Sequence, residues 1–166
     1  MNDNNSDQDK KGKLFELIDG IEIGMLVTVS SHGDLRSRPM SVRTTDTDHY
    51  IWFLTDKDSA KVLEIENHCR VNVSFSRPSD FTFVSVSGTA TLSDDRNKID
   101  EIWTADAGIW FPEGKDDPRL TLIRVEPTDA EYWCSTGNRF VNLFKIASAA
   151  IRGEQPNVGS NRKIDF

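Results

Sequence analysis

The sequence predicts a mainly β protein of the α+β class with short helices, in which six or seven strands form a small closed or split β-barrel. Apolar runs of strand length recur along the chain, and turn-forming residues separate them at hairpin spacing. Helical patterns are short and do not alternate regularly with the strands, which disfavours a parallel sheet built from βαβ units. A barrel of antiparallel hairpins is therefore expected.

The chain has the length of one domain with one core. It has 166 residues, of which 37% are hydrophobic, and only its two ends are strongly polar. Residues 1–10 are predicted to be a disordered tail and residues 152–166 a polar C-terminal tail, because neither holds enough apolar side chains to pack. Residues 11–151 then form the barrel domain.

The first half of the domain begins with a short helix and continues as hairpins. Apolar residues at helical spacing predict an amphipathic helix over residues 11–19. Two apolar runs, 24–30 and 35–42, flank the turn 31–34 and predict a hairpin. After a second turn, the aromatic and β-branched residues at 50–54 predict a strand buried on both faces or nearly so.

A second helix is predicted directly after this strand. Asp58 and Ser59 are both good N-caps, and the helical pattern ends near Asn67. Three apolar side chains of this helix are expected to face the core: Val62, Leu63 and Ile65. Apolar and polar residues then alternate over residues 71–76, which predicts a half-buried strand.

The remaining elements complete the predicted barrel. Residues 81–92 are long for a strand, and Gly88 within them suggests a bend or bulge that lets the sheet curl. Three further parts are expected: a helix capped by residues 93–95, two strands at 120–126 and 130–134, and a final helix over 138–151. Trp103 and Trp133 are expected in the core.

Charge and hydropathy exclude two classes of partner. The net charge of −7 argues against a general nucleic-acid binder, which normally carries a basic surface. No stretch approaches the run of about 18 apolar residues that spans a bilayer, and the N-terminus lacks the pattern of a signal peptide. A soluble, cytoplasmic protein that binds neither nucleic acid nor membrane is expected.

The cysteines and histidines do not predict a metal site. Cys69 and Cys134 lie far apart in the sequence, and neither belongs to a Cys-x-x-Cys pair. His68 directly precedes Cys69, so the two side chains would diverge on a strand. His32 and His49 lie in turn-like sequence, where a solvated histidine is the usual outcome.

The most distinctive segment runs from Arg36 to Lys61 and has the composition of a phosphate site. Arg38 and Arg43 lie on or next to the predicted strand 35–42, and Ser59 precedes Lys61 at the predicted start of a helix. Free backbone amides and the positive end of the helix dipole favour an anion at such a start. The sequence therefore predicts a bound phosphate.

Together these residues resemble the split-barrel flavin-binding proteins related to pyridoxamine 5′-phosphate oxidase, and within them the general stress protein branch. The resemblance covers residues 14–133 and includes the aromatic, Gly/Pro-rich segment 110–118. It implies an FMN-binding split barrel, with FMN expected ahead of FAD or a deazaflavin. The cofactor-binding residues that it implies are Arg38, Pro39, Met40, Arg43, Leu54, Thr55, Asp56, Ser59, Lys61 and Trp110.

Within that set the resemblance assigns two ends of the cofactor. The phosphate end would contact Arg38, Arg43, Thr55, Ser59 and Lys61, whereas Pro39 and Met40 would lie against the flavin ring. The family also binds flavin at a two-fold interface, which implies a homodimer in which Trp110 belongs to the partner's site.

The chain departs from the oxidase at three places. Ala60 stands where the oxidase has a second basic residue, and Phe83 stands where it has a glutamine that contacts the ring. The oxidase ends in a segment with Trp and Arg that binds flavin and substrate, whereas this chain ends in a polar segment. Oxidation of pyridoxamine 5′-phosphate is therefore not expected.

Two functions in different classes follow from the resemblance. The first is a stress-related flavin-dependent oxidoreductase that acts on an unknown small substrate, with a reduced nicotinamide as a possible reductant. The alternative is a flavin-binding stress or sensor protein without turnover. A barrel that binds an apolar ligand and no flavin is a third hypothesis. No residue stands out as a proton donor, so the catalytic residues are unknown.

Overall fold

The computed structural model describes residues 3–44, 49–134 and 160–165. These residues form eight strands in one antiparallel sheet, three α-helices and two 3₁₀ helices. The strands are β1 (Ile23–Val29), β2 (Leu35–Ser41), β3 (Arg43–Thr44), β4 (Ile51–Asp56), β5 (Arg70–Arg77), β6 (Thr82–Ser93), β7 (Leu120–Cys134) and β8 (Ser160–Asp165). The helices are α1 (Asp3–Ile18), α2 (Ala60–Asn67), α3 (Arg96–Ile102), η1 (Ala105–Ile109) and η2 (Gly114–Asp116).

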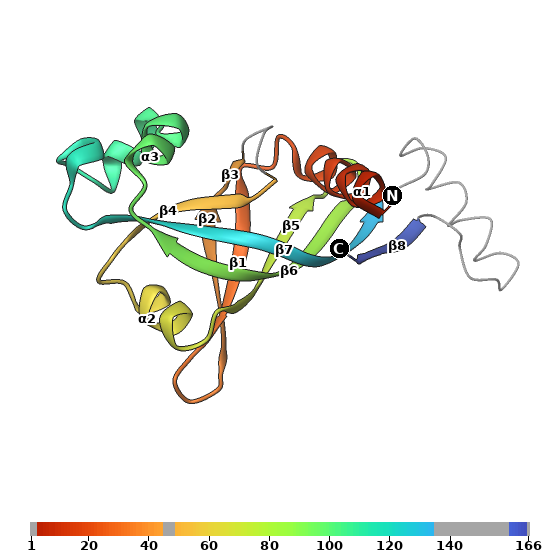
Figure 1. The fold of residues 1–166 in the computed structure, drawn as a ribbon, viewed down its shortest axis with the longest axis horizontal. Coiled ribbons are helices and arrows are strands. Elements are labelled where there is room, and N and C mark those ends of the chain that lie inside the picture. The colour runs from red at the N-terminus through yellow and green to blue at the C-terminus, as the bar shows by residue number, and fades with distance from the viewer. Residues whose placement is uncertain (1–2, 45–48, 135–159, 166) are drawn as a thin grey trace, which may run out of the picture.

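The order of the strands explains why the sheet curls. The hydrogen-bonded path runs β2-β1-β5-β6-β7-β4-β3, and β8 pairs with β7 beside this path. The two ends of the path, β2 and β3, are consecutive in the chain and are separated only by Val42. Because one residue joins the first strand of the path to the last, the sheet curls so that these two edge strands come close to each other at Val42 (Figure 1).

The predicted fold class is confirmed, and the difference lies in the strand count. Eight strands replace the expected six or seven, because β3 and β8 are short pairings without a strong apolar pattern. The segments 120–126 and 130–134 form one continuous strand, β7. Pro127, which lies between the two predicted strands, is opposite Gly88 at a shift in register between β6 and β7. The bulge thus accommodates a residue that cannot donate to the ladder.

Gly88 is the bend that the sequence predicted. A Cβ atom at this position would lie 2.5 Å from the carbonyl oxygen of Glu126 and 2.8 Å from a methyl group of Val125. Both distances are far below a normal van der Waals contact, so the close approach of β6 to β7 requires glycine. The predicted bulge is confirmed.

The core fills the inside of the curled sheet. Alternate residues of β1, β5 and β6 point inward, and α1 adds Leu14 and Ile18 to the same cluster. A smaller second cluster joins β4 and the start of β7 to α3, through Trp52, Ile99 and Leu122. The second cluster fixes α3 and the 3₁₀ helices that follow it at one end of the molecule.

The two chain ends differ from the predicted tails. Helix α1 begins at Asp3, so residues 3–10, which were expected to be disordered, continue the predicted helix 11–19. Ser160–Asp165, part of the expected polar tail, pairs with β7 as strand β8. The predicted helix 138–151 lies outside the described residues.

Two predictions about apolar side chains are wrong. On α2, Leu63 is 58% exposed while its neighbour Glu64 is only 6% exposed. The helix buries the flank that carries Val62 and Ile65, three residues apart, and Leu63 lies off that flank. Trp133 is 40% exposed instead of buried, since it lies on the outer face of β7.

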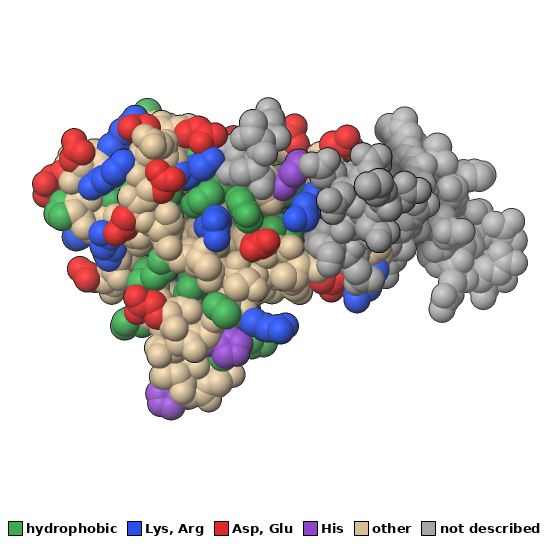
Figure 2. All heavy atoms as spheres, viewed as in Figure 1, with side chains coloured by type: hydrophobic (Ala, Val, Ile, Leu, Met, Phe, Trp, Pro, Cys, Tyr) green, Lys and Arg blue, Asp and Glu red, His purple; other side chains and the backbone are tan. Residues whose placement is uncertain are grey.

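The helices divide the molecule into two ends. Helix α2 and the segment from α3 to η2 lie at the end on the left of Figure 1, whereas α1, β8 and both chain ends lie toward the right. Positive and negative side chains are interspersed over the α3 end and form no continuous patch of either sign (Figure 2). Of the helices that the structure describes, none combines the length and the hydropathy needed to cross a bilayer.

Candidate functional site

Most of the predicted cofactor residues lie on three neighbouring elements. Arg38, Pro39 and Met40 are on β2, residues 54–56 end β4, and Lys61 lies in the first turn of α2. Strands β2 and β4 are not hydrogen-bonded neighbours, yet they contact each other because the sheet curls. The curl therefore brings together residues from opposite ends of the strand order.

The start of α2 presents backbone amides without a side-chain cap. Ser59 is the N-cap residue with an extended backbone, as predicted, but its hydroxyl makes no capping bond. Instead it donates to the carbonyl oxygen of Asp56 at 2.7 Å and lies 3.5 Å from the hydroxyl of Thr55. An N-cap hydroxyl normally accepts from a first-turn amide. Here the Val62 amide donates to the carbonyl oxygen of Ser59 at 3.0 Å, and the amides of Ala60 and Lys61 are left, among the described residues, for water or for an anion.

Lys61 lies at the same helix start and has no hydrogen bond or ion pair to any other described residue. Burial, reinforced by the positive charge of Arg38, lowers the pKa of the Lys61 ammonium, and the negative charges of Asp56 and Glu64 offset only part of that effect. A half-buried cation next to another cation is held in an unfavourable environment, and an anion between them would relieve it. This position fits a phosphate.

Arg38 is held in place by two other side chains. Its Nη1 donates to the Thr28 hydroxyl at 2.6 Å, and its Nη2 donates to Oε2 of Glu64 at 2.8 Å. The Thr28 hydroxyl in turn donates to the same Glu64 oxygen at 2.5 Å. Arg36 completes the group with a weaker contact of 3.4 Å to Oε1 of Glu64.

Glu64 is the residue of this group that the sequence interpretation missed. Burial disfavours its ionised form, but the Thr28 hydroxyl and the Arg38 guanidinium outweigh burial and lower the pKa of Glu64. The carboxylate is thus an integral part of the site. The sequence hardly distinguishes Glu64 from the exposed Glu66. The one difference is that Glu64 lies three residues after Lys61, which places the two side chains next to each other on the helix.

The structure directs Arg43 toward η1. Its Nη2 donates to the Thr104 hydroxyl at 2.7 Å and to Oδ2 of Asp106 at 2.9 Å, and its buried Nε has no partner among the described residues. The same Thr104 and Arg43 contacts lower the pKa of Asp106. Arg43 therefore joins β3 to the segment that carries Trp110.

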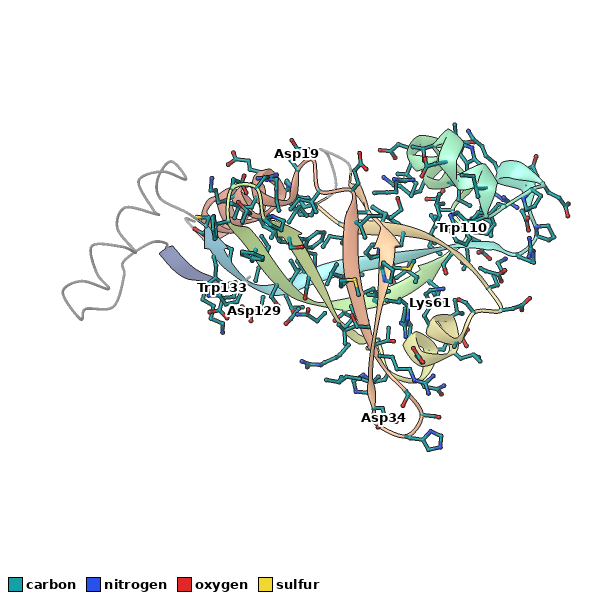
Figure 3. The ribbon with its side chains drawn as sticks, turned by 180° about the vertical axis from the view of Figure 1, so that it is seen from behind. Asp19, Asp34, Lys61, Trp110, Asp129 and Trp133 are labelled. Atoms are coloured by element: carbon teal, nitrogen blue, oxygen red, sulfur yellow. The ribbon has the colours of Figure 1, made fainter. Side chains whose placement is uncertain are left out.

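The remaining apolar residues of the predicted cofactor set differ in exposure. Pro39 is exposed on β2, whereas Met40 and Leu54 are half-buried against the two core clusters. Trp110 follows η1 and is 77% exposed. Lys61 and Trp110 lie at the same end of the molecule, on α2 and beyond η1 respectively (Figure 3).

Asp56 has other partners at the end of β4. One of its carboxylate oxygens accepts from the backbone amide of Asp58 at 2.8 Å, and the other lies 3.5 Å from Arg119. These contacts shape the loop that leads into α2. Asp56 thus borders the predicted phosphate position through its backbone, which receives the Ser59 hydroxyl.

A surface pocket of about 320 Å³ lies beside α2. Its lining residues are Lys57, Val62, Glu66, Leu92, Ser93, Asp94 and Thr121. None of the predicted cofactor residues is among them, so the pocket is separate from the group around Arg38 and Lys61. Within the described ranges no cluster of three or more His, Cys, Asp or Glu side chains could hold a metal ion.

Comparison with known proteins shows the relationships of the chain. General stress protein 26 of Bacillus subtilis (strain 168) is 32% identical over 125 residues, covering 74% of this chain and 86% of that protein. The solved structure of a candidate general stress protein 26 from Jannaschia sp. CCS1 has 26% identity and a TM-score of 0.76, covering 96% of this chain and 99% of that one.

A third relative is named for its ligand. The general stress FMN/FAD binding protein of Xanthomonas citri is 27% identical with a TM-score of 0.67, covering 79% of this chain and 92% of that one. Residues 9–157 match the model of the family described as pyridoxamine 5′-phosphate oxidase like. The chain therefore belongs to the pyridoxamine 5′-phosphate oxidase-like family.

Proposed function

We propose that this protein binds FMN and holds its phosphate at the start of α2. The observation that carries the proposal is the combination of the uncapped Ala60 and Lys61 amides with the Lys61 ammonium, which makes no hydrogen bond or ion pair to another described residue. Amides at a helix start and a nearby cation are the donor set that a phosphate needs. Arg38, Thr55 and Ser59 border the same position.

The ring of the flavin would then lie toward Pro39, Met40 and Leu54. Trp110 supports a site at this end of the molecule, since its indole is 77% exposed and tryptophan is enriched at binding interfaces. Arg43 would offer its Nη2 to the phosphate if it gave up Asp106, whose side chain is 61% exposed. The name of the Xanthomonas citri relative supports a flavin ligand.

The expected activity is that of a flavin-dependent oxidoreductase on a small substrate. A bound flavin supplies hydride or electron transfer, and the chain supplies binding, orientation and charge. The carboxylates nearest the proposed phosphate position, Glu64 and Asp56, are both occupied by hydrogen bonds or ion pairs. A proton would therefore come from water or from the substrate.

The same observation supports the alternative of a flavin-binding stress protein without turnover. Oxidation of pyridoxamine 5′-phosphate is not proposed, because Phe83 stands where the oxidase has a glutamine that contacts the ring. A cytoplasmic location stays a prediction.

Two measurements test the cofactor and the activity in turn. The visible spectrum and mass of any molecule that co-purifies would identify a flavin, and FMN should bind more tightly than riboflavin, which lacks the phosphate. Protein that stays colourless after FMN is offered would contradict the proposal. Anaerobic addition of NADH or NADPH to the FMN-loaded protein should then bleach the flavin band if it is an oxidoreductase, whereas a persistent band supports the binder.

We further propose a homodimer, which the outer face of the sheet supports. Ile23 and Met25 on β1 and Phe83 and Trp133 on β6 and β7 are all exposed. The strand register places them on one face, and Phe83 lies directly opposite Trp133. Light scattering after gel filtration should give twice the 18.7 kDa chain mass. A single-chain mass at micromolar concentration would contradict the dimer.

A further inference from the structure

Glu64 is a buried acid that the proposed phosphate site does not itself require. Its side chain is only 7% exposed, although it lies on a short helix at the surface. A buried carboxylate beside a phosphate would by charge alone weaken phosphate binding. Its presence at this place therefore needs a reason other than direct contact with the ligand.

The hydrogen bonds of Glu64 form a closed group of three side chains from three elements. Arg38 of β2 donates to both Thr28 of β1 and Glu64 of α2, and Thr28 donates to Glu64. The distance from Arg38 to Glu64 is that of a charge-assisted hydrogen bond, and both contacts of the Thr28 hydroxyl are shorter. An arginine side chain has many rotamers when free, so this group orders Arg38 before any ligand arrives.

The group also fixes which part of Arg38 remains available. A guanidinium has five N–H donors, and two of them are used by Thr28 and Glu64. The other three remain for a further acceptor, as far as the described residues go. Arg38 is close enough to Lys61 for its charge to act on the Lys61 ammonium. The Glu64 carboxylate also acts on the Lys61 ammonium by charge, so one buried acid lies close enough to both cations to favour their charged forms.

We propose that Glu64 is a positioning residue that, together with Thr28, holds Arg38 beside Lys61 and so makes the site select a phosphate-bearing flavin over an unphosphorylated one. The inference rests on the proposed function, because it names the origin of phosphate selectivity at that same site. Glu64 acts through Arg38 and does not touch the ligand.

The test compares FMN with riboflavin in the variant Glu64→Gln, which keeps the shape and one acceptor oxygen. Flavin fluorescence titration gives both dissociation constants. The preference for FMN should fall about tenfold, the loss of roughly one charge-assisted hydrogen bond, while riboflavin affinity stays the same. Glu66→Gln is the matched control, since it removes the same charge two residues away on an exposed position, and its preference should equal that of the wild type.

A double-mutant cycle shows whether Glu64 acts through Arg38. In an Arg38→Ala background, Glu64→Gln should no longer change the preference for FMN. Thr28→Val, which keeps the shape but removes the hydroxyl, should lower the preference in the same direction and serves if Glu64→Gln does not fold. Circular dichroism on each variant reports folding.

Three results would overturn the inference. Tighter FMN binding by Glu64→Gln would make Glu64 a competitor of the phosphate, an equal loss for FMN and riboflavin would make it purely structural, and an unchanged effect in the Arg38→Ala background would remove Arg38 from its action. A wild-type protein without any preference for FMN would instead overturn the proposed function, so the two failures are distinguishable.

Discussion

Arg38 and Arg43 were both predicted to bind the phosphate of the flavin, yet their side chains lie in two different environments. Their side chains are similarly buried, at 21% and 16% exposed, and each binds one carboxylate and one hydroxyl. The difference is in the carboxylates: the side chain of Glu64 is 7% exposed and that of Asp106 is 61% exposed. The two ion pairs therefore differ in the solvent exposure of their acids and not in that of their arginines.

Solvent exposure of the acid decides how easily each arginine can change partner. An exposed ion pair contributes little to stability, because water and salt replace either partner. A buried pair cannot be separated without leaving an uncompensated charge in a medium of low polarity. We therefore expect Arg38 to stay in place when a ligand binds, and Arg43 to be exchangeable.

The largest difference in stability between the two ion pairs should appear when each acid is truncated to alanine. Glu64→Ala should destabilise the fold by about 3–5 kcal/mol, because it leaves Arg38 without its buried partner. Asp106→Ala should leave the unfolding midpoint almost unchanged, since water replaces the carboxylate. Urea unfolding followed by circular dichroism measures both, and similar midpoints for the two variants would erase the distinction between the pairs.

The stabilisation by Glu64 should depend on pH in a defined direction. Since the folded state lowers the pKa of Glu64, its contribution is complete above the unfolded value of about 4.3 and is lost as the pH falls through the lower, folded value. The difference in unfolding free energy between the wild type and Glu64→Gln should therefore be constant near neutral pH and shrink below about pH 4. A difference that grows on acidification would contradict the charged assignment.

A smaller effect is expected at Lys61. Lys61→Ala should weaken FMN binding about tenfold or more, the loss of one charge-assisted bond to phosphate, while riboflavin affinity stays constant. Lys57→Ala is the control, because Lys57 lies in the preceding loop and pairs with Asp94 at 3.1 Å. Equal FMN affinity of Lys61→Ala and the wild type would remove Lys61 from the site.

The smallest effect on stability should come from the end that carries η1. Trp110→Ala should change the unfolding free energy by less than about 0.5 kcal/mol, because the indole is largely exposed and packs on little. Flavin affinity should fall in the same variant if Trp110 contacts the ring. A large loss of stability would instead show that the indole is packed, in this chain or against a second copy.

The sequence was sufficient for features that depend on neighbouring residues. The alternation around Val73 defines β5, Gly88 marks the bulge, and Ser59 ends up as the N-cap of α2. Each follows from local sterics or from a period of two, so no distant residue is needed to recognise it. The mainly β fold follows from the sum of such signals.

Partners that lie far apart in the chain could not be predicted. Asp106 is 63 positions from Arg43, and Glu64 is 36 positions from Thr28. Leu63, which was expected to face the core, is exposed, and its neighbour Glu64 is buried. The position of α2 on the sheet, and not hydropathy alone, decides which flank of the helix is buried. Side-chain pairing across elements depends on how the sheet curls, and hydropathy patterns do not contain that information.

Val42 is a connection of one residue between β2 and β3, and the fold fixes its length. This single residue carries the chain from β2 to β3, and its amide donates to the carbonyl oxygen of Glu22 at 2.8 Å. Arg38 precedes this connection, and the strand that leads to α2 follows it. Residues added here would therefore separate the two halves of the proposed site. The turn at Gly33, at the other end of β2, can lengthen without that consequence. Among relatives, the length of the turn at Gly33 should therefore vary, whereas the length of the connection at Val42 should stay constant.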